Sequence, residues 1–550
     1  MSLDTDILII GAGMSGIGLA VQLIRNYGLR DFEIVEKTED IGGTWWMNTY
    51  PGCGCDVASH LYSYSFALNP DWTQKFSKQT EIQAYFRKVA ECYGLFTHVS
   101  FSSMVRSSRW DSRTGTWMVE ILEVKTQEVR MRRCKVLLSA VGALSVPKEC
   151  EIPGASNFKG SLFHSAEWDH NFDYTKKGVV VIGNGCSATQ FVPVMSDGEN
   201  KAKKITQFSR QAHWLSERPN PAYSALFKWT MRWVPGAMRA YRAKIYYDME
   251  WDFAGFYIKS GEKIRQGLTR TAIDYIKKES PKRYHEALIP KTVIGCKRKV
   301  MDTSYLSSLH RENVELIHSD PIQRIQERGV ITESGSQVLF PMEIYGENGV
   351  SLNKHWASTS DGAAQAYYGT CVSGFPNFFI MMGPNTTTGH LSVIYSVECQ
   401  INFTMRLIEP ILHSLHPRSS LLSFIKRSQT SPDVVAVKSD AEKADNIWIM
   451  EKTQELVWSS GCSSWYLDPK TNRNVMIYPS WQFHFWLRSI FIPQKDFIYR
   501  SSNAREKPDG TNRKKSIALV SWAATAATAV LIGVALLAMK AAEANGWENQ

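Results

Sequence analysis

Two glycine-rich turns contain the residues whose types and spacing most directly suggest chemistry. Gly11, Gly13 and Gly16 follow the apolar run 6–10 and precede a helix-like segment, 17–25. In this position glycines permit a tight turn, let the backbone approach a pyrophosphate and let strand and helix pack closely. Glu36 ends the next strand-like run, where a carboxylate binds ribose hydroxyls. The pattern predicts a site for FAD or NAD.

A second turn, with the pattern GxGxxA, follows the strand-like run 178–182 and opens another helix. It predicts a second bound dinucleotide. Its predicted ligands are Gly183, Asn184, Gly185, Ser187 and Gln190. The next strand ends in Arg210 and not in a carboxylate. A carboxylate there selects NAD, whereas an arginine accommodates the 2′-phosphate of NADP. Arg210 therefore favours NADPH, with a plain surface arginine as the alternative.

The segment 42–56 combines glycine, tryptophan and proline in a way that suits neither a plain helix nor a plain strand. It contains Gly42-Gly43-Thr44-Trp45, then Tyr50-Pro51-Gly52, and it ends at Asp56. Paired glycines soon after Glu36 predict a backbone that lies against a flavin. A structural loop with buried tryptophans is the alternative.

The link between the two turns carries another spaced pattern. Residues 158–169 read FxGxxxHxxxWD, formed by Phe158, Gly160, His164, Trp168 and Asp169. This stretch resembles the fingerprint of type I Baeyer–Villiger monooxygenases, and segment 42–56 is similar to that family's motif GxWxxxx[Y/F]PGxxxD. The resemblance extends over about residues 4–490. The chain is identified as a member of this family, of the kind common in fungal secondary metabolism.

The resemblance implies bound FAD and NADPH, and insertion of one oxygen atom from O2 into a ketone to give an ester or lactone. NADPH would reduce FAD, the reduced flavin would capture oxygen as a peroxide anion, and that anion would attack the ketone. The implied flavin contacts are Thr44, Trp45, Asp56 and Tyr62. The fingerprint residues would lie at the hinge between two domains, which gives His164 a conformational role and not that of a base.

Residues 295–305 resemble the family pattern GxKRxxxDxxY. By this match Lys297 joins Arg210 at the NADP phosphate, Arg298 is the active-site cation, and Asp56 holds Arg298 in place. Arg298 and Asp56 are the implied catalytic residues. In the family Arg210 is often followed by Ser or Thr; here Gln211 follows, which removes one implied phosphate ligand.

One expected element is missing from the sequence. The family's strand and ATG turn should follow the hairpin-like stretch 329–337, but the sequence continues directly with Val338-Leu339-Phe340-Pro341. An altered gene model or splice form is one explanation. Two alternatives to a ketone-oxidising monooxygenase stay open. One is an N- or S-oxygenating flavin monooxygenase, and the other is an inactive membrane-anchored remnant that lacks the ATG segment.

Composition limits the other possibilities. The 550 residues allow two to four domains, and 44% hydrophobic with 21% charged residues is typical of a globular protein. The net charge of +10 comes from scattered Lys and Arg, which does not favour a nucleic-acid partner. No CxxC pair or metal-binding pattern is present among the ten cysteines, which are expected to be reduced. The substrate's identity and the oligomeric state stay open.

The predicted fold class is α/β, with two Rossmann-like dinucleotide-binding domains, a helical insertion and a C-terminal transmembrane helix. The insertion, roughly 219–283, resembles the family segment that roofs the substrate pocket. The predicted divisions are a first FAD segment (1–142), a linker with the fingerprint (143–177), an NADP domain with the insertion (178–328), a second FAD segment (329–500), a basic linker (501–515) and the membrane helix (516–539).

The C-terminal prediction rests on 24 residues without a charge, 516–539, between Lys515 and Lys540. This length spans a bilayer core as a helix. Arg513, Lys514 and Lys515 place the positive side next to the large domain, which favours a cytosolic catalytic body on an endoplasmic-reticulum membrane. A soluble alanine-rich helix is the alternative.

Overall fold

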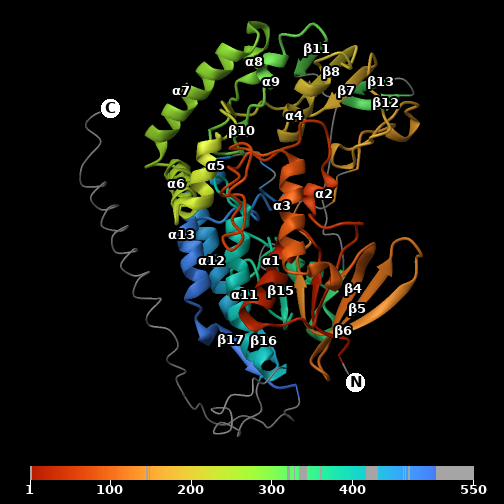
Figure 1. The fold of residues 1–550 in the computed structure, drawn as a ribbon, viewed down its shortest axis with the longest axis vertical. Coiled ribbons are helices and arrows are strands. Elements are labelled where there is room, and N and C mark those ends of the chain that lie inside the picture. Colours follow the sequence, from red (N-terminus) through yellow and green to blue (C-terminus); the bar gives the residue numbers. More distant parts are fainter. Residues whose placement is uncertain are drawn as a thin grey trace, which may run out of the picture. The chain divides into compact units, whose positions relative to one another are not determined.

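The computed structural model describes most of the chain within one compact unit, residues 1–503 (Figure 1). The described residues are 3–143, 146–147, 149–318, 322–326, 329–332, 343–358, 362–415, 432–461, 464, 466–468 and 471–502. The membrane span predicted at 516–539 lies outside these residues. Among the residues that the structure does describe, no helix is long and apolar enough to cross a bilayer.

An eight-stranded sheet forms the centre of the larger α/β layer. Its strand order is β14-β4-β5-β6-β1-β2-β3, and β15 also pairs with β6. The strands are β1 (Thr5–Ile10), β2 (Phe32–Val35), β3 (Val99–Ser100), β4 (Ser103–Asp111), β5 (Thr116–Glu123), β6 (Val129–Ser139), β14 (Glu343–Tyr345) and β15 (Phe378–Ile380). Strands from both ends of the chain thus share one sheet.

The parallel part of this sheet is buried on both faces. β1 pairs in parallel with β2 and β6, and all six of its residues are buried. Ile7 and Ile9 contact one hydrophobic core cluster, and Leu8 and Ile10 contact another. A strand covered on both faces needs apolar side chains at every position, which explains the unbroken run before Gly11.

A smaller parallel sheet carries the second glycine-rich turn. Its order is β11-β8-β7. The strands of this sheet are β7 (Gly178–Ile182), β8 (Lys204–Ser209) and β11 (Val314–His318). Three separate two-stranded sheets also form: β9 (Leu215–Ser216) with β10 (Val300–Met301), β12 (Ile322–Gln326) with β13 (Gly329–Thr332), and β16 (Val434–Val437) with β17 (Phe497–Arg500). The predicted α/β class with two dinucleotide-binding sheets is confirmed.

Helices follow both turns and cover both sheets. Those of the larger sheet and its surroundings are α1 (Met14–Gln22), α2 (Thr44–Met47), α3 (Gln79–Cys92), α10 (Leu352–Ala357), α11 (Val393–Leu415), α12 (Ser439–Gln454) and α13 (Gln482–Ile490). Those between β7 and β11 are α4 (Cys186–Met195), α5 (Ala225–Trp233), α6 (Ala237–Glu250), α7 (Glu262–Glu279), α8 (His285–Leu288) and α9 (Tyr305–Ser308). Helices α5 to α7 form the expected helical insertion.

The return to the larger sheet differs from a simple crossover. The hairpin of β12 and β13 packs on residues 153–154, because Ile325 N donates to Pro153 O over 2.7 Å. The next described strand, β14, pairs in parallel with β4 at the outer edge of the larger sheet. The sequence between them, where the ATG turn is missing, lies at 333–342 and outside the described residues.

Cysteine chemistry departs from expectation at one position. Eight cysteines are free in the part of the chain that the structure describes. Cys296, next to Lys297, is disulfide-bonded, so the expectation that all cysteines are reduced is wrong there. Spacing along the chain could not show this, because no second cysteine lies near it in sequence.

Gly16 gives a direct test of the first turn. A Cβ atom at Gly16 would lie 1.9 Å from Gly11 O, which is backbone and cannot move aside. We expect Gly16→Ala to lower the free energy of unfolding by about 1–3 kcal/mol or more. Gly267→Ala in α7 is the control, since its Cβ would have nothing within 4 Å. Calorimetry that gives both variants the wild-type melting temperature would contradict this packing.

Candidate active site

A cavity of about 1350 Å³ lies between the two glycine-rich turns. This exceeds the roughly 300–1,000 Å³ of ordinary small-ligand sites. Most of the residues predicted from the sequence meet in its lining: Gly11, Gly13, Glu36, Thr44, Trp45, Asp56, Tyr62, Gly183, Asn184, Gly185, Gln190, Arg210, Lys297 and Arg298. Gly16 and Ser187 are absent from this lining, as are the five fingerprint residues described below. Gly16 packs on Gly11, and Ser187 lines a neighbouring cavity.

Two backbone segments form a cradle at one end of this cavity. A Cβ on Gly43 would lie 2.9 Å from the Cα of Gly13. The two backbone segments therefore touch at positions that have no side chain. Gly43 also has a positive φ of 55°. The N-terminus of α1, which follows Gly13, has no side-chain cap. Free backbone N–H groups at a helix N-terminus bind phosphate, so this cradle fits the pyrophosphate of a dinucleotide.

Glu36 is fixed at the end of β2 by three hydrogen bonds. Its Oε2 accepts from Ala12 N over 2.7 Å, and its Oε1 accepts from Thr38 N and Thr38 Oγ1 over 2.9 and 2.7 Å. The side chain is buried yet lines the cavity. A carboxylate held in this way has lone pairs left for ribose hydroxyls.

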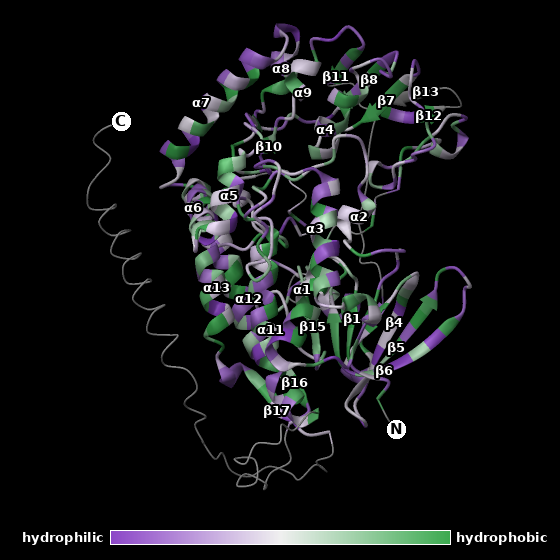
Figure 2. Cartoon of the chain, viewed as in Figure 1, coloured by the Kyte–Doolittle hydropathy of each residue, from purple (hydrophilic) through white to green (hydrophobic). Residues whose placement is uncertain are grey.

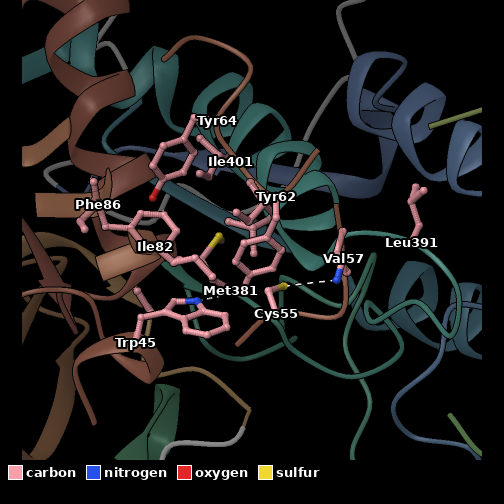
Figure 3. Close-up of a cluster of buried hydrophobic side chains, with 14 of the residues drawn as sticks. Trp45, Cys55, Val57, Tyr62, Tyr64, Ile82, Phe86, Met381, Leu391 and Ile401 are labelled. Atoms are coloured by element: carbon pink, nitrogen blue, oxygen red, sulfur yellow. Dashed lines mark hydrogen bonds between the residues drawn. The ribbon is translucent and has the colours of Figure 1, made fainter. Parts of the chain in front are cut away.

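Trp45 and Tyr62 form one wall of the cavity (Figure 3). Trp45 Nε1 donates to Tyr62 OH over 3.1 Å, and the two rings meet edge to face with centroids 5.6 Å apart. Figure 3 shows them beside Met381 and Cys55. Burial raises the pKa of Tyr62 above its usual range, so its phenol stays protonated. The wall is therefore aromatic and uncharged.

Asp56 and Arg298 form a bidentate ion pair across the cavity. Arg298 Nη2 and Nε donate to the two oxygens of Asp56 over 2.7 and 3.0 Å. The Asp56 carboxylate raises the pKa of the Arg298 guanidinium. The cation is thus permanent and fixed in direction, while its side chain keeps one third of its surface exposed to the cavity. Such a charge can stabilise an anion that develops beside it.

The surroundings of this pair are largely neutral. Burial raises the pKa of Tyr466 to about 12, so its phenol stays protonated. Arg218 is a half-buried cation near this pair; it donates to Cys55 O over 2.5 Å and stacks on Phe76 at 4.9 Å. No sequence motif points to Arg218, because it stands alone before Pro219. It fixes the backbone next to Asp56.

The predicted phosphate ligands converge beyond the second turn. Arg210 and Lys297 both line the cavity. Gln211 accepts a hydrogen bond from Lys297 Nζ through its side chain and another from Asn184 Nδ2 through its backbone over 3.0 Å. Burial lowers the pKa of Lys297. Gln211, which replaces the expected Ser or Thr, therefore orients the lysine.

Gln190 connects the two halves of the site. Its Oε1 accepts from Tyr50 OH and Gly54 N over 3.1 and 3.3 Å, and its Nε2 donates to Gly54 O over 3.0 Å. Sequence reasoning placed Gln190 at a nucleotide. The structure places its amide on segment 50–54, so that the helix α4 is bound to the loop that carries Asp56.

The fingerprint residues lie apart from the ion pair. Phe158, His164 and Trp168 line a second cavity, of about 1190 Å³, together with β7. Trp168 contacts Phe191 of α4 at 5.5 Å, and His164 Nδ1 accepts from Ala166 N over 3.1 Å. Gly160 would place a Cβ 2.6 Å from the ring of Phe158. This placement is compatible with a hinge, a role that stays a prediction.

The role of the helical insertion as a roof over the substrate stays a prediction. Among the described residues that line the cavity between the two glycine-rich turns, none belongs to α5, α6 or α7. The insertion packs on segment 60–63, where Arg242 Nη1 donates to His60 O and Ser63 O over 2.8 and 2.7 Å. Other segments contribute to the lining of the cavity, including Thr387, Leu391 and Tyr466.

Comparison with known proteins agrees with this geometry. The family model described as FMO-like, flavin-binding monooxygenase-like, matches residues 4–231. A Baeyer–Villiger monooxygenase from Pseudomonas aeruginosa is 32% identical over 92% of this chain and 94% of that protein. FAD-binding monooxygenase ktnD from Aspergillus niger is 32% identical over 97% of this chain and 88% of that protein.

Solved structures share the fold. The structure of OTEMO in complex with FAD and NADP (form 3) has a TM-score of 0.74 at 24% identity and covers 91% of this chain and 100% of that one. Cyclohexanone monooxygenase from Rhodococcus sp. Phi1, bound to NADP+, has a TM-score of 0.71 at 22% identity over 90% and 99%. With the identity and coverage of its sequence relatives, the chain belongs to the family of type I Baeyer–Villiger monooxygenases.

Proposed function

We propose that the protein is an FAD-dependent, NADPH-consuming monooxygenase that inserts one oxygen atom from O2 into a ketone to give an ester or lactone. The observation that carries this proposal is the Asp56–Arg298 ion pair, which faces the cavity between two dinucleotide-binding turns. An ester-forming oxygenation needs a fixed positive charge in a site shielded from water. Family membership supports the same reaction.

The residues present fit both cofactors. The Gly13–Gly43 cradle and Glu36 would hold the pyrophosphate and ribose of FAD, while Arg210 and Lys297 would hold the 2′-phosphate of NADPH. When bound, FAD supplies the redox and oxygen chemistry, with reducing equivalents from NADPH. The protein's own contribution is to bind, orient and stabilise charge.

Each group near the ion pair has a separate task. Arg298 supplies a permanent cation, and Asp56 fixes its direction through both carboxylate oxygens. The neutral wall of Trp45 and Tyr62 excludes water and adds no competing charge. In a site of low polarity a fixed charge stabilises a developing anion more strongly than it would in water. Proton transfer is not assigned to His164, which lies away from Arg298.

Removing the Arg298 cation should abolish ester formation. We expect Arg298→Ala to lower the turnover of a ketone to its ester by roughly 10²–10³-fold or more, the range seen when one stabilising donor is lost. FAD should remain bound, because the Gly13–Gly43 cradle is untouched. Arg298→Lys keeps the charge but loses the bidentate geometry and should retain part of the activity. Product analysis and flavin absorbance measure both effects.

Two outcomes would contradict the proposal. Normal ester yield from Arg298→Ala would remove Arg298 from the reaction. Oxygenation of an amine or sulfide, with no product from ketones, would favour an N- or S-oxygenating enzyme. A colourless wild-type protein that cannot be reconstituted with FAD would instead indicate an inactive remnant that lacks the ATG segment.

Arg210 should set the preference for NADPH. A charge-assisted hydrogen bond contributes about 1.5–3 kcal/mol, so Arg210→Ala should raise the KM for NADPH by roughly tenfold to a hundredfold. The KM for NADH, which has no 2′-phosphate, should hardly change. Lys201→Ala, an exposed lysine on the same unit, is the control. Equal effects on both KM values would show that Arg210 does not bind the phosphate.

We further propose that residues 516–539 anchor the chain in an endoplasmic-reticulum membrane, with the catalytic body in the cytosol. The support is the sequence: 24 uncharged residues between Lys515 and Lys540, with three basic residues before them. A role in secondary metabolism, on an apolar ketone, is part of this proposal.

Removal of the segment tests the anchor. The full chain should sediment with membranes and resist extraction with alkaline carbonate, because a spanning helix is not released by high pH. A chain that ends at residue 503, the limit of the compact unit, should be released by carbonate. Replacing 504–515 with a Gly/Ser linker is the control for chain length and should keep resistance. Release of the full chain by carbonate would contradict an anchor.

A further inference from the structure

We propose that helix α5 forms an interfacial contact with an anionic lipid bilayer, separate from the segment 516–539. The contact surface, called here the α5 face, consists of Leu226, Trp229, Trp233 and Val234. Figure 2 colours much of α5 green, in contrast to the extensive purple of α7. The α5 face belongs to the described unit, so this inference does not depend on the C-terminal anchor.

The α5 face is unusually exposed for its chemistry. Leu226, Trp229 and Trp233 keep 72%, 56% and 64% of their surface exposed, and Val234 keeps 42%. Leu226, Trp229 and Trp233 are three and seven residues apart, so they lie along one side of the helix. Solvent-facing helix positions are ordinarily polar or charged. A row of large apolar side chains there indicates contact with an apolar phase or a partner.

The fold itself does not require these side chains. The opposite side of α5 supplies the packing: Met231 is buried, and Phe227 stacks on Tyr223 at 4.3 Å and meets Tyr241 at 5.2 Å. His60 contacts Phe227 at 5.7 Å, and burial lowers its pKa to about 4, so a neutral ring completes this cluster. The α5 face is therefore additional to the core.

The helix is held rigidly with this face outward. Arg232 is ion-paired with Asp71, and Tyr223 N donates to Thr73 O over 2.9 Å. In the next helix, α6, Arg242 donates to His60 O and lies 3.6 Å from Glu398 of α11. An ordered platform loses less conformational entropy on binding than a mobile one.

Charge identifies the bilayer surface that fits. Residues 225–279, which include α5, α6 and α7, contain eleven Lys and Arg against six Asp and Glu. Arg232 and Arg242 pair with Asp71 and Glu398, which lie outside this segment, so an excess of three positive charges remains in one tenth of the chain. Tryptophan favours the region between water and acyl chains, and nearby Lys and Arg attract anionic headgroups.

A second copy of this chain fits the surface less well. A twofold contact through the α5 face would bring together two copies of a segment with an excess of positive charge, which is a repulsive arrangement. Lysine is also depleted at protein–protein interfaces. An anionic bilayer satisfies both the aromatic row and the basic residues around it.

Hydrogen–deuterium exchange on the full chain tests the proposal. The chain would be placed in nanodiscs of phosphatidylcholine alone, in nanodiscs that also contain phosphatidylserine, and in neutral detergent. We expect exchange in peptides from 225–250 to be slowest with phosphatidylserine, and the protection to weaken at high salt. The double variant Trp229→Glu with Trp233→Glu should lose this protection by about tenfold or more.

A matched control separates the α5 face from general exposure. Met131 in β6 is also half exposed, and Met131→Glu should leave the protection of 225–250 unchanged. Equal exchange in all three environments would overturn the proposal even if 516–539 inserts. Equal protection by both lipids would overturn the preference for anionic headgroups. Protection in detergent that rises with protein concentration would overturn it in favour of a second copy. If the double variant does not fold, the exchange of the wild-type chain in the three environments still tests the proposal.

Discussion

The bidentate pair of Asp56 and Arg298 is the interaction on which the rest of the site depends. Its members are 242 residues apart and come from loops carried by different sheets. Because a lone buried charge is costly, each partner requires the other in position. The pair therefore makes the relative position of the two nucleotide-binding turns a condition for a stable active site. Arg218 and Gln190 fix the backbone and helix on either side of it.

The sequence predicted the elements of this site far better than their contacts. The turns at Gly11 and Gly183 have local causes: an apolar strand, glycines and a helix, all within a short stretch. Glu36 could be placed by its position at the end of the next strand, and Arg298 by the resemblance of residues 295–305 to a family pattern. The amide of Gln190 could not, because its partners lie 136 residues away and depend on how two units pack. Long-range packing determines which polar atoms become hydrogen-bond partners.

The same limit applies to the insertion and to Ser187. The contact of Arg242 with segment 60–63 has no signature in the spacing of the sequence. Ser187 belongs to the turn pattern and lines the neighbouring cavity, and its contact with a cofactor stays a prediction. The absence of the ATG strand stays a prediction from the sequence, since residues 333–342 lie outside the described part of the chain. The next described strand, β14, pairs with β4 at the edge of the larger sheet.

Gln190 has a consequence for motion. One side chain carries three hydrogen bonds to the loop 50–54, and Gly52 admits no Cβ, since it would lie 2.6 Å from Gln190 O. Helix α4 and this loop therefore cannot slide past each other by small steps; they are either engaged or apart. Any rotation of one nucleotide unit against the other must release all three bonds together. The joint therefore resists small displacements, because its three bonds share one side chain.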